Sequence, residues 1–538
     1  MNFNKTIIAL LFAAATTAST PPSSQAAIPY DNISRAVMNT YEEMLRENYR
    51  DYEVLYRRAN DYYHHEEYLK AIDDLDRAVK YCPETDTEML FPIYALRSAS
   101  YWQLKRYTQA LDDIDQAITI DPSNSAALQM RADLHLELDN MSAAKADYER
   151  LRRMNPRSTE ALFGLARIAA KEKNIGMANE YCEMATGLSP AQSAVFVGRA
   201  EVKQLMGDYN GAVDDLLLAL ATDASDPLAL PKLVEMANGN YAAVMTGLSN
   251  AIKTAPRTPL YYWLRGSIAA AHYHYVSAIK DFSHIIDNNL YNYAGLYTLL
   301  AECHHALGDY RTALDNIELA ITKYDEDDDV AHYYAVRSRI LLALDDSERA
   351  LQSAERALDF NPDSSEALMA KAMAQLKLKQ YDDAQAIVGE VLMNEPYNPM
   401  PYFYRAWILN DFLNQPGTAK NYYTRVIDLG LDHSERISSM LGFARLFAGE
   451  TPRATAWMDE CLSQPDYDGR THYLGACFYA WAGRKERALE CMEKALELGY
   501  ANYHDWTSNS DARINVEPIR SLPRFKELLD SYASIFGK

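Results

Sequence analysis

The side chains that could do chemistry form none of the motifs that enzymes use. GxGxxG, GxxxxGK[ST], HExxH and GxSxG are all absent. Histidines gather between residues 272 and 305 and again at His64-His65, but never as HxxxH on one helix face, the spacing that places two ligands on one metal ion. We therefore expect solvated or packing histidines, no metal, no cofactor and no catalytic residue, so that the chain is not an enzyme.

An acidic run, Asp325 to Asp329, begins like a calcium-binding loop. The next residue is Val330, where the loop needs a glycine for its sharp turn, and no acid follows at the twelfth position. We expect the run to stabilise the start of the following helix through its negative charge.

Cysteine chemistry is equally unpromising, because no CxxC pair exists for a zinc site or a redox centre. Most of the six cysteines fall where a small apolar residue would pack in a helix, so buried thiols are expected. Cys461, Cys477 and Cys491 are close enough in sequence for one disulfide.

The elements that hold these side chains repeat every 34 residues. Pro122, Pro156 and Pro190 keep this spacing, and so does a series of alanines: Ala110, Ala144, Ala178 and Ala212. Each period contains two amphipathic stretches joined by a short turn, such as Gly207-Asp208, and proline or aspartate usually ends the second stretch. The repeat predicts pairs of helices rather than independent globular domains.

This pattern resembles the tetratricopeptide repeat family. The first repeat carries the family's residues at its characteristic positions: Leu55, Ala59, Tyr62, Ala71, Leu75, Ala78 and Pro83. The match runs over about residues 52–500. The resemblance implies an all-α, right-handed superhelical solenoid of about 12 helix-turn-helix repeats, with capping helices at both ends and contacts only between neighbouring repeats.

The pattern also divides the chain. We expect a signal peptide at 1–26, an N-terminal capping helix at 27–51, a regular block at 52–223, a degenerate repeat at 224–257, a second block at 258–500 and C-terminal capping helices at 501–538. In the degenerate repeat, Pro227, Pro231 and Gly239 should interrupt the first helix. This repeat is either a bend between the blocks or an ordinary stacked unit. The last segment is similar to a tail that closes many bacterial members of the family.

Arginine at position 7 of several repeats accompanies aspartate sixteen residues later. We predict salt bridges between the two helices of one repeat for these pairs: Arg58/Asp74, Arg97/Asp113, Arg131/Asp147, Arg199/Asp215 and Arg265/Asp281. The fourth repeat has Leu165 and Tyr181 instead, and Arg337 faces Ser353. If exposed, each pair would contribute about 0.2–1 kcal/mol.

The family resemblance implies a concave groove lined by positions 2, 5, 9, 12 and 13 of each first helix. Six aromatic residues of the last repeats occupy such positions: Phe403, Trp407, Phe443, Phe447, Tyr473 and Trp481. They would bind a peptide or a sugar ring if exposed, or pack against the C-terminal cap if buried. The family's clamp for a C-terminal carboxylate is not supported, because only Asn60 matches it.

Charge and the N-terminus suggest where the protein works. The net charge of −22 disfavours nucleic acid and anionic lipid as partners. Lys5, the apolar run 6–15 and small residues before a cleavage point after Ala26 resemble a secretory signal, and the run is too short to span a bilayer. We expect a periplasmic or secreted scaffold that binds another protein through its concave face. The alternative is a module that binds carbohydrate or peptidoglycan through the aromatic patch.

Overall fold

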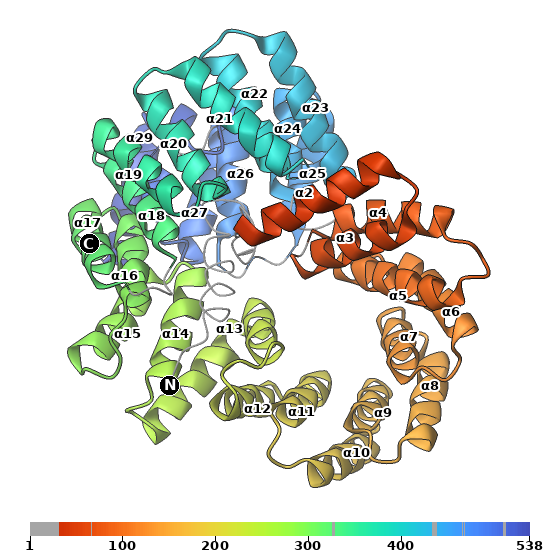
Figure 1. Cartoon of the computed structure of the whole chain (residues 1–538). Helices are drawn as coiled ribbons and strands as arrows, with labels where there is room; N and C mark the ends of the chain where they lie inside the picture. Colours follow the sequence, from red (N-terminus) through yellow and green to blue (C-terminus); the bar gives the residue numbers. More distant parts are fainter. Residues whose placement is uncertain are drawn as a thin grey trace. The chain divides into compact units, whose positions relative to one another are not determined.

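The computed structural model describes residues 32–65, 67–324, 329–396, 398–432, 438–464, 466, 468–508 and 513–537. The predicted signal peptide and most of the acidic run at 325–329 lie outside these residues. Every regular element of the described residues is a helix (Figure 1). The chain forms two compact units that divide between residues 250 and 251, called unit 1 and unit 2 below.

Unit 1 begins with α2, which packs on the first repeat as expected of a cap. Its helices are α2 (Asn32–Glu47), α3 (Tyr52–His64), α4 (Tyr68–Tyr81), α5 (Thr87–Gln103), α6 (Tyr107–Ile120), α7 (Ser125–Glu137), α8 (Met141–Met154), α9 (Thr159–Lys171), α10 (Ile175–Leu188), α11 (Ser193–Leu205), α12 (Tyr209–Thr222) and α13 (Ala229–Thr254), which crosses into unit 2.

Unit 2 continues the same alternation and ends in shorter elements. Its helices are α14 (Pro259–Ala271), α15 (Tyr275–Asp287), α16 (Ala294–Ala306), α17 (Tyr310–Lys323), α18 (Val330–Ala343), α19 (Ser347–Phe360), α20 (Ser365–Lys377), α21 (Tyr381–Asn394), α22 (Pro399–Asp411), α23 (Pro416–Asp432), α24 (Ser438–Phe447), α25 (Thr451–Ser463), α26 (Arg470–Trp481), α27 (Lys485–Glu497), α28 (Tyr503–Thr507), η1 (Glu517–Ile519), α29 (Pro523–Ser531) and η2 (Ala533–Phe536).

Local chemistry sets where these helices start and turn. Asn124 and Ser158 cap α7 and α9 by accepting hydrogen bonds from backbone N–H groups three residues ahead. In most repeats the turn between the two helices contains one residue with positive φ, and Gly207 adopts it at φ 82° without the strain that a side chain would add.

Close crossing of the two helices explains the small residues of the repeat. Ala132 and Ala144 are fully buried where α7 crosses α8. Ser98 stands in place of alanine in α5, and its hydroxyl donates to the carbonyl of Ala110 in α6 at 2.6 Å. A larger side chain at either position would force the backbones apart.

The degenerate repeat at 224–257 differs from the expectation. Pro227 precedes α13 and Pro231 lies in its first turn, where the missing N–H needs no intrahelical partner, so neither interrupts the helix. The only non-helical residue inside α13 is Asn240 (φ −150°, ψ 68°), whose side chain accepts a hydrogen bond from the backbone N–H of Ala243. This repeat is a helix pair joined by a minimal turn.

Candidate interaction surfaces

The structure brings together both members of all five Arg/Asp pairs. Each arginine donates two parallel hydrogen bonds to its aspartate, at 2.5–2.8 Å. Two bonds between two planar groups fix the angle and the register of the two helices.

The five pairs are buried, so the condition attached to the range of about 0.2–1 kcal/mol is not met. Each aspartate lies on the face of the second helix that packs against the first helix, and each arginine is largely covered. Exposure is only a few per cent for all five carboxylates: Asp74 (3%), Asp113 (5%), Asp147 (5%), Asp215 (3%) and Asp281 (6%). The range for exposed ion pairs therefore does not apply to them, because removing either partner would leave a buried charge without compensation.

Some of these arginines also reach the preceding repeat. Arg97 bonds Asp76 of α4 at 2.8 Å, and Arg131 bonds Asp115 of α6 at 2.9 Å. Arg337 also has a second partner in the preceding repeat, because it contacts Glu318 of α17 at 3.1 Å. It donates a hydrogen bond to the hydroxyl of Ser353 in its own repeat at 2.6 Å. The arginine therefore ties neighbouring repeats together as well as the helices of its own repeat.

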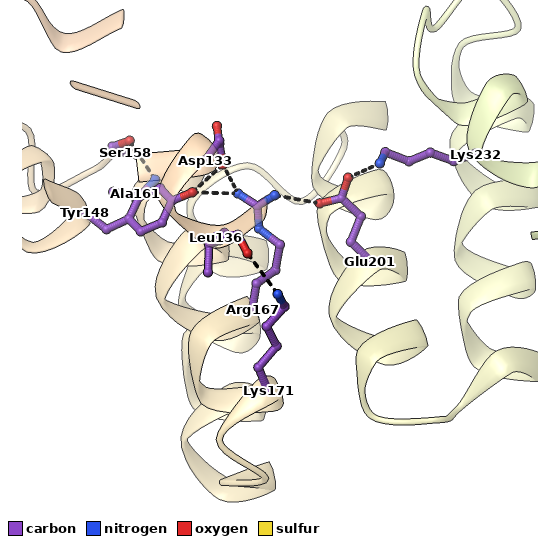
Figure 2. Close-up of polar contacts among 9 residues, drawn as sticks. All are labelled: Asp133, Leu136, Tyr148, Ser158, Ala161, Arg167, Lys171, Glu201 and Lys232. Atoms are coloured by element: carbon purple, nitrogen blue, oxygen red, sulfur yellow. Dashed lines mark hydrogen bonds and ion pairs between the residues drawn. The ribbon is translucent and has the colours of Figure 1, made fainter. Parts of the chain in front are cut away.

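A row of four charged residues runs across the first helices of consecutive repeats in unit 1 (Figure 2). Asp133 on α7 pairs with Arg167 on α9 at 2.5 Å, Arg167 pairs with Glu201 on α11 at 3.4 Å, and Glu201 pairs with Lys232 on α13. In Figure 1, α7 and α9 lie on the inner side of the arc of unit 1, and α8 and α10 lie on its outer side. We call these four residues the charge ladder.

The charge ladder is firmly supported yet still reaches solvent. The hydroxyl of Tyr148, from the second-helix layer, donates to Asp133 and accepts a hydrogen bond from Arg167 at 3.0 Å. Each ladder side chain keeps between 18 and 30% of its surface exposed. The negative neighbours raise the pKa of Arg167 despite its burial, so the guanidinium stays charged.

Tyr148 reaches the ladder because α9 carries a glycine above its ring. A Cβ at Gly164 would lie 2.3 Å from Cε1 of Tyr148, which is far closer than van der Waals contact allows. Without that side chain, the buried ring passes under α9 and presents its hydroxyl to the concave side. Burial and the carboxylate of Asp133 both raise the pKa of this phenol, so it remains a hydrogen-bond donor.

The six aromatic residues predicted for a binding groove do not form an exposed patch. Four are buried (Phe403, Trp407, Phe443 and Tyr473), and Phe447 and Trp481 are half-buried. Phe403, Phe443 and Trp481 pack around Phe447. Trp407 packs against Tyr404 and Phe412, and Tyr473 packs against Tyr500 and Trp506. The residues after α28 cover Phe447 and Trp481: the indole N–H of Trp481 donates to the carbonyl of Asn515 at 3.0 Å, and the guanidinium of Arg513 lies over both rings.

The groove interpretation of these aromatics is therefore wrong, and with it the sugar-binding alternative loses its basis. Covering the aromatic rings with the chain's own C-terminal residues removes apolar surface from water, and this is why they are not available to a partner.

The C-terminal segment, which comprises the residues after α27, also contacts the first repeats of unit 2. Tyr310 on α17 hydrogen-bonds Nδ1 of His504 on α28 at 2.8 Å, although 194 residues separate them. The rings of Tyr273 and Tyr500 lie 4.4 Å apart, and Nδ1 of His272 lies 3.6 Å from Asp468. The expectation that each repeat contacts only its neighbours is wrong for unit 2, because the segment after α27 joins the first and last repeats.

Beneath this segment lies a pocket of about 60 Å³, room for a few water molecules. Glu302, His305 and Arg339 line it from α16 and α18, and Asn502 and His504 line it from the C-terminal segment. Burial lowers the pKa of His504 to about 4, and Arg339 and Arg520 act in the same direction. Burial and the adjacent His504 also lower the pKa of His305, so both imidazoles are neutral near pH 7.

The remaining candidate groups show no further chemistry within the described ranges. The six cysteines, all of them described, form no disulfide, so the suggested bridge among Cys461, Cys477 and Cys491 is absent. No group of three or more potential metal ligands occurs in the described part of the chain. Among the helices of the described residues, none is both long and apolar enough to cross a membrane.

Comparison with known proteins agrees with this geometry. Models of the tetratricopeptide repeat match residues 91–124, 130–193 and 341–400. No curated protein shows a significant match.

Similar solved structures include a tetratricopeptide repeat protein from Parabacteroides merdae (16% identity, 54% of this chain and 98% of that chain, TM-score 0.27). Others are YrrB, described as a TPR protein with an unusual peptide-binding site (19%, 36% and 96%, TM-score 0.26), and yeast Tom70 (14%, 90% and 96%, TM-score 0.36). Residues 91–124, 130–193 and 341–400 are thus tetratricopeptide repeats, and the fold that contains them is an all-α tetratricopeptide-repeat solenoid.

Proposed function

We propose that this protein is a non-catalytic scaffold that binds a peptide segment of another protein on the concave face of unit 1. The charge ladder is the observation that carries the proposal. Four consecutive repeats present partly exposed groups of alternating sign. A partner that replaces the hydration of these groups with its own polar groups would gain charge-assisted hydrogen bonds.

The neighbouring first helices add features suited to a peptide. Tyr56 and Trp102 are half-buried on α3 and α5, at positions where the family places its groove, and Ala95 and Ala99 occupy two more of these positions on α5. Aromatic side chains next to small residues are typical anchors for a bound peptide. Packed helices lie about 8–10 Å apart, so an extended peptide at about 3.3 Å per residue would meet a new repeat every third residue.

The ladder can be tested by capture of partners with variants of the full chain. Arg167→Gln removes the central charge, and Arg356→Gln makes the same change at an exposed ion pair on α19. We expect partners captured by the wild type to be retained by Arg356→Gln and lost, or at least tenfold reduced, with Arg167→Gln. Circular dichroism would establish that both variants remain folded.

A photo-crosslinking amino acid would locate the contact directly. Placed at Gln204, an exposed residue of α11 on the concave side, it should crosslink the captured partner. Placed at Met393, which is 77% exposed on α21, it should not. Equal crosslinking from both sites, or capture unaffected by Arg167→Gln, would refute the concave face of unit 1 as the binding surface.

We further propose that the scaffold is exported to the periplasm or the medium after cleavage following Ala26. Support comes from Lys5, the short apolar run and the small residues before this position. Mass spectrometry of the protein from a cell fractionation should then find Ala27 as the first residue, outside the cytoplasm. An intact N-terminus in the cytoplasmic fraction would contradict export.

A further inference from the structure

The segment from Tyr500 to Thr507 lies on the concave side of unit 2 like a bound peptide. The pocket beneath it is lined by first helices of three consecutive repeats, α14, α16 and α18, which is the face where such repeats are expected to receive a ligand. Of the segment's polar residues, Asn502, His504 and Asp505 are at most 6% exposed. Their burial shows that the segment packs into the surface and does not only lie on top of it.

Three side chains of the segment make the specific contacts. The ring of Tyr500 stacks on that of Tyr473 with centroids 4.7 Å apart, and it contacts the tilted ring of Tyr273 at 4.4 Å. Nδ1 of His504 forms a hydrogen bond with the hydroxyl of Tyr310 at 2.8 Å, and the His504 ring lies 4.2 Å from that of His305. The fully buried ring of Trp506 meets Tyr473 edge-on at 5.0 Å.

The receiving surface is shaped for this segment. Gly308 has φ 77°, and a Cβ there would lie 2.9 Å from the ring of Tyr503. Within the segment, the hydroxyl of Tyr500 donates to Asp505, and Asn502 accepts from the backbone N–H of the same residue. These two hydrogen bonds restrict the conformation of the segment, and such restriction lowers the entropic cost of binding.

We propose that this part of the concave face is a peptide-binding surface whose ligand is the chain's own segment Tyr500–Thr507, and that unit 2 accepts an external peptide of the same chemistry only when this segment is displaced. Such a peptide carries aromatic residues at the places of Tyr500 and Trp506, and a neutral side chain that can hydrogen-bond the hydroxyl of Tyr310 at the place of His504. The proposal is independent of the ladder in unit 1, and it implies that external partners of the intact chain do not use this surface.

The test is peptide binding in trans to the full chain. The probe is a fluorescein-labelled synthetic peptide with the sequence of residues 498–508, followed by fluorescence anisotropy. We expect no saturable binding to the wild type and saturable binding to Trp506→Ala, whose own segment has lost its buried anchor. A peptide carrying alanine at the places of His504 and Trp506 should bind at least tenfold more weakly.

Trp457→Ala is the matched control, because this tryptophan lies on α25 against Gly442 and away from the segment. It should resemble the wild type and bind no peptide. Equal peptide binding to the wild type and to Trp506→Ala would overturn the proposal, and so would a folded Trp506→Ala chain that binds nothing.

Tyr310→Phe provides a second readout if Trp506→Ala does not fold. It deletes the hydroxyl that bonds Nδ1 of His504, so hydrogen exchange of residues 500–508 should become at least threefold faster. Exchange in α20 and α21, which do not contact the segment, should be unchanged. Unchanged exchange of residues 500–508 would also overturn the proposal.

Discussion

Replacing Gly164 with alanine should destabilise unit 1, although glycine is a poor helix former. The new Cβ would lie 2.3–2.5 Å from three carbons of the Tyr148 ring. The ring has no free space, because Tyr148 is fully buried and its hydroxyl is held by Asp133 and Arg167. The substitution must therefore displace either α9 or the ring.

The expected magnitude follows from three contributions. Overpacking a core costs about 1–3 kcal/mol. Loss of a hydrogen bond to a charged group costs about 1.5–3 kcal/mol if the Tyr148 hydroxyl leaves Asp133. Alanine in place of a helical glycine returns about 0.5–1 kcal/mol. The free energy of unfolding should fall by about 1.5–5.5 kcal/mol in total.

Urea denaturation followed by circular dichroism measures this change, with Gly187→Ala as the matched control. Gly187 lies in α10, and no atom lies within 4 Å of the position that a Cβ would take there, so the control should gain about 0.5–1 kcal/mol. In the double variant Gly164→Ala/Tyr148→Leu, the loss should be smaller than the sum of the single losses, because the clash disappears. If Gly164→Ala proved as stable as Gly187→Ala, the account of the buried ring would be refuted.

Asp113→Ala should lower the free energy of unfolding, measured by urea denaturation, by about 3 kcal/mol, because it leaves Arg97 buried without its bidentate partner. The double variant Arg97→Met/Asp113→Leu should be nearly as stable as the wild type, and equal losses in the single and double variants would contradict this. Ser353→Asp should leave the free energy of unfolding nearly unchanged, because the ion pair with the facing Arg337 offsets the desolvation of a carboxylate at this buried position; a large loss would contradict this. Burial raises the pKa of Asp505 to about 7 from 3.8, so its contribution to stability is full below pH 3.8 and is lost as the pH rises through about 7. Asp505→Asn should therefore gain in Tm relative to the wild type between about pH 4 and 7, and a constant difference over this range would contradict this. Maleimide should label Cys461 before the five buried thiols, and faster labelling of any other would be inconsistent with the structure.

The sequence was sufficient for the helix pairs and for the salt bridges inside a repeat. Arg97 and Asp113 recur at one spacing in several repeats, so the 34-residue period itself implies that they face each other. The second partners of these arginines were also visible as acids at one fixed position, Asp76, Asp115 and Glu318, but comparing residues within one repeat does not reveal a contact between repeats. The charge ladder has the same origin: Asp133, Arg167 and Glu201 are each 34 residues apart.

The burial of the six aromatic residues could not be predicted from the repeat period. Their positions in the repeat indicate which way they point, but not what lies opposite them. Trp481 is covered by Asn515 and Arg513, and these residues fall after the last repeat, where no period relates them to α26. The contact between Tyr310 and His504 likewise joins segments that share no pattern, so only the folded chain reveals it.

The contact of the C-terminal segment with the first repeats of unit 2 has a consequence for folding. A solenoid with two free ends can lose its terminal repeats one at a time, because each repeat depends only on its neighbour. In unit 2, the last residues hold the first helix pairs, so fraying at either end must also break the contacts of Tyr500 and His504. Bringing residues 194 positions apart into contact carries a large loop-closure entropy, which slows folding. Unit 2 should therefore form late and then unfold as one cooperative body, whereas unit 1 can assemble repeat by repeat.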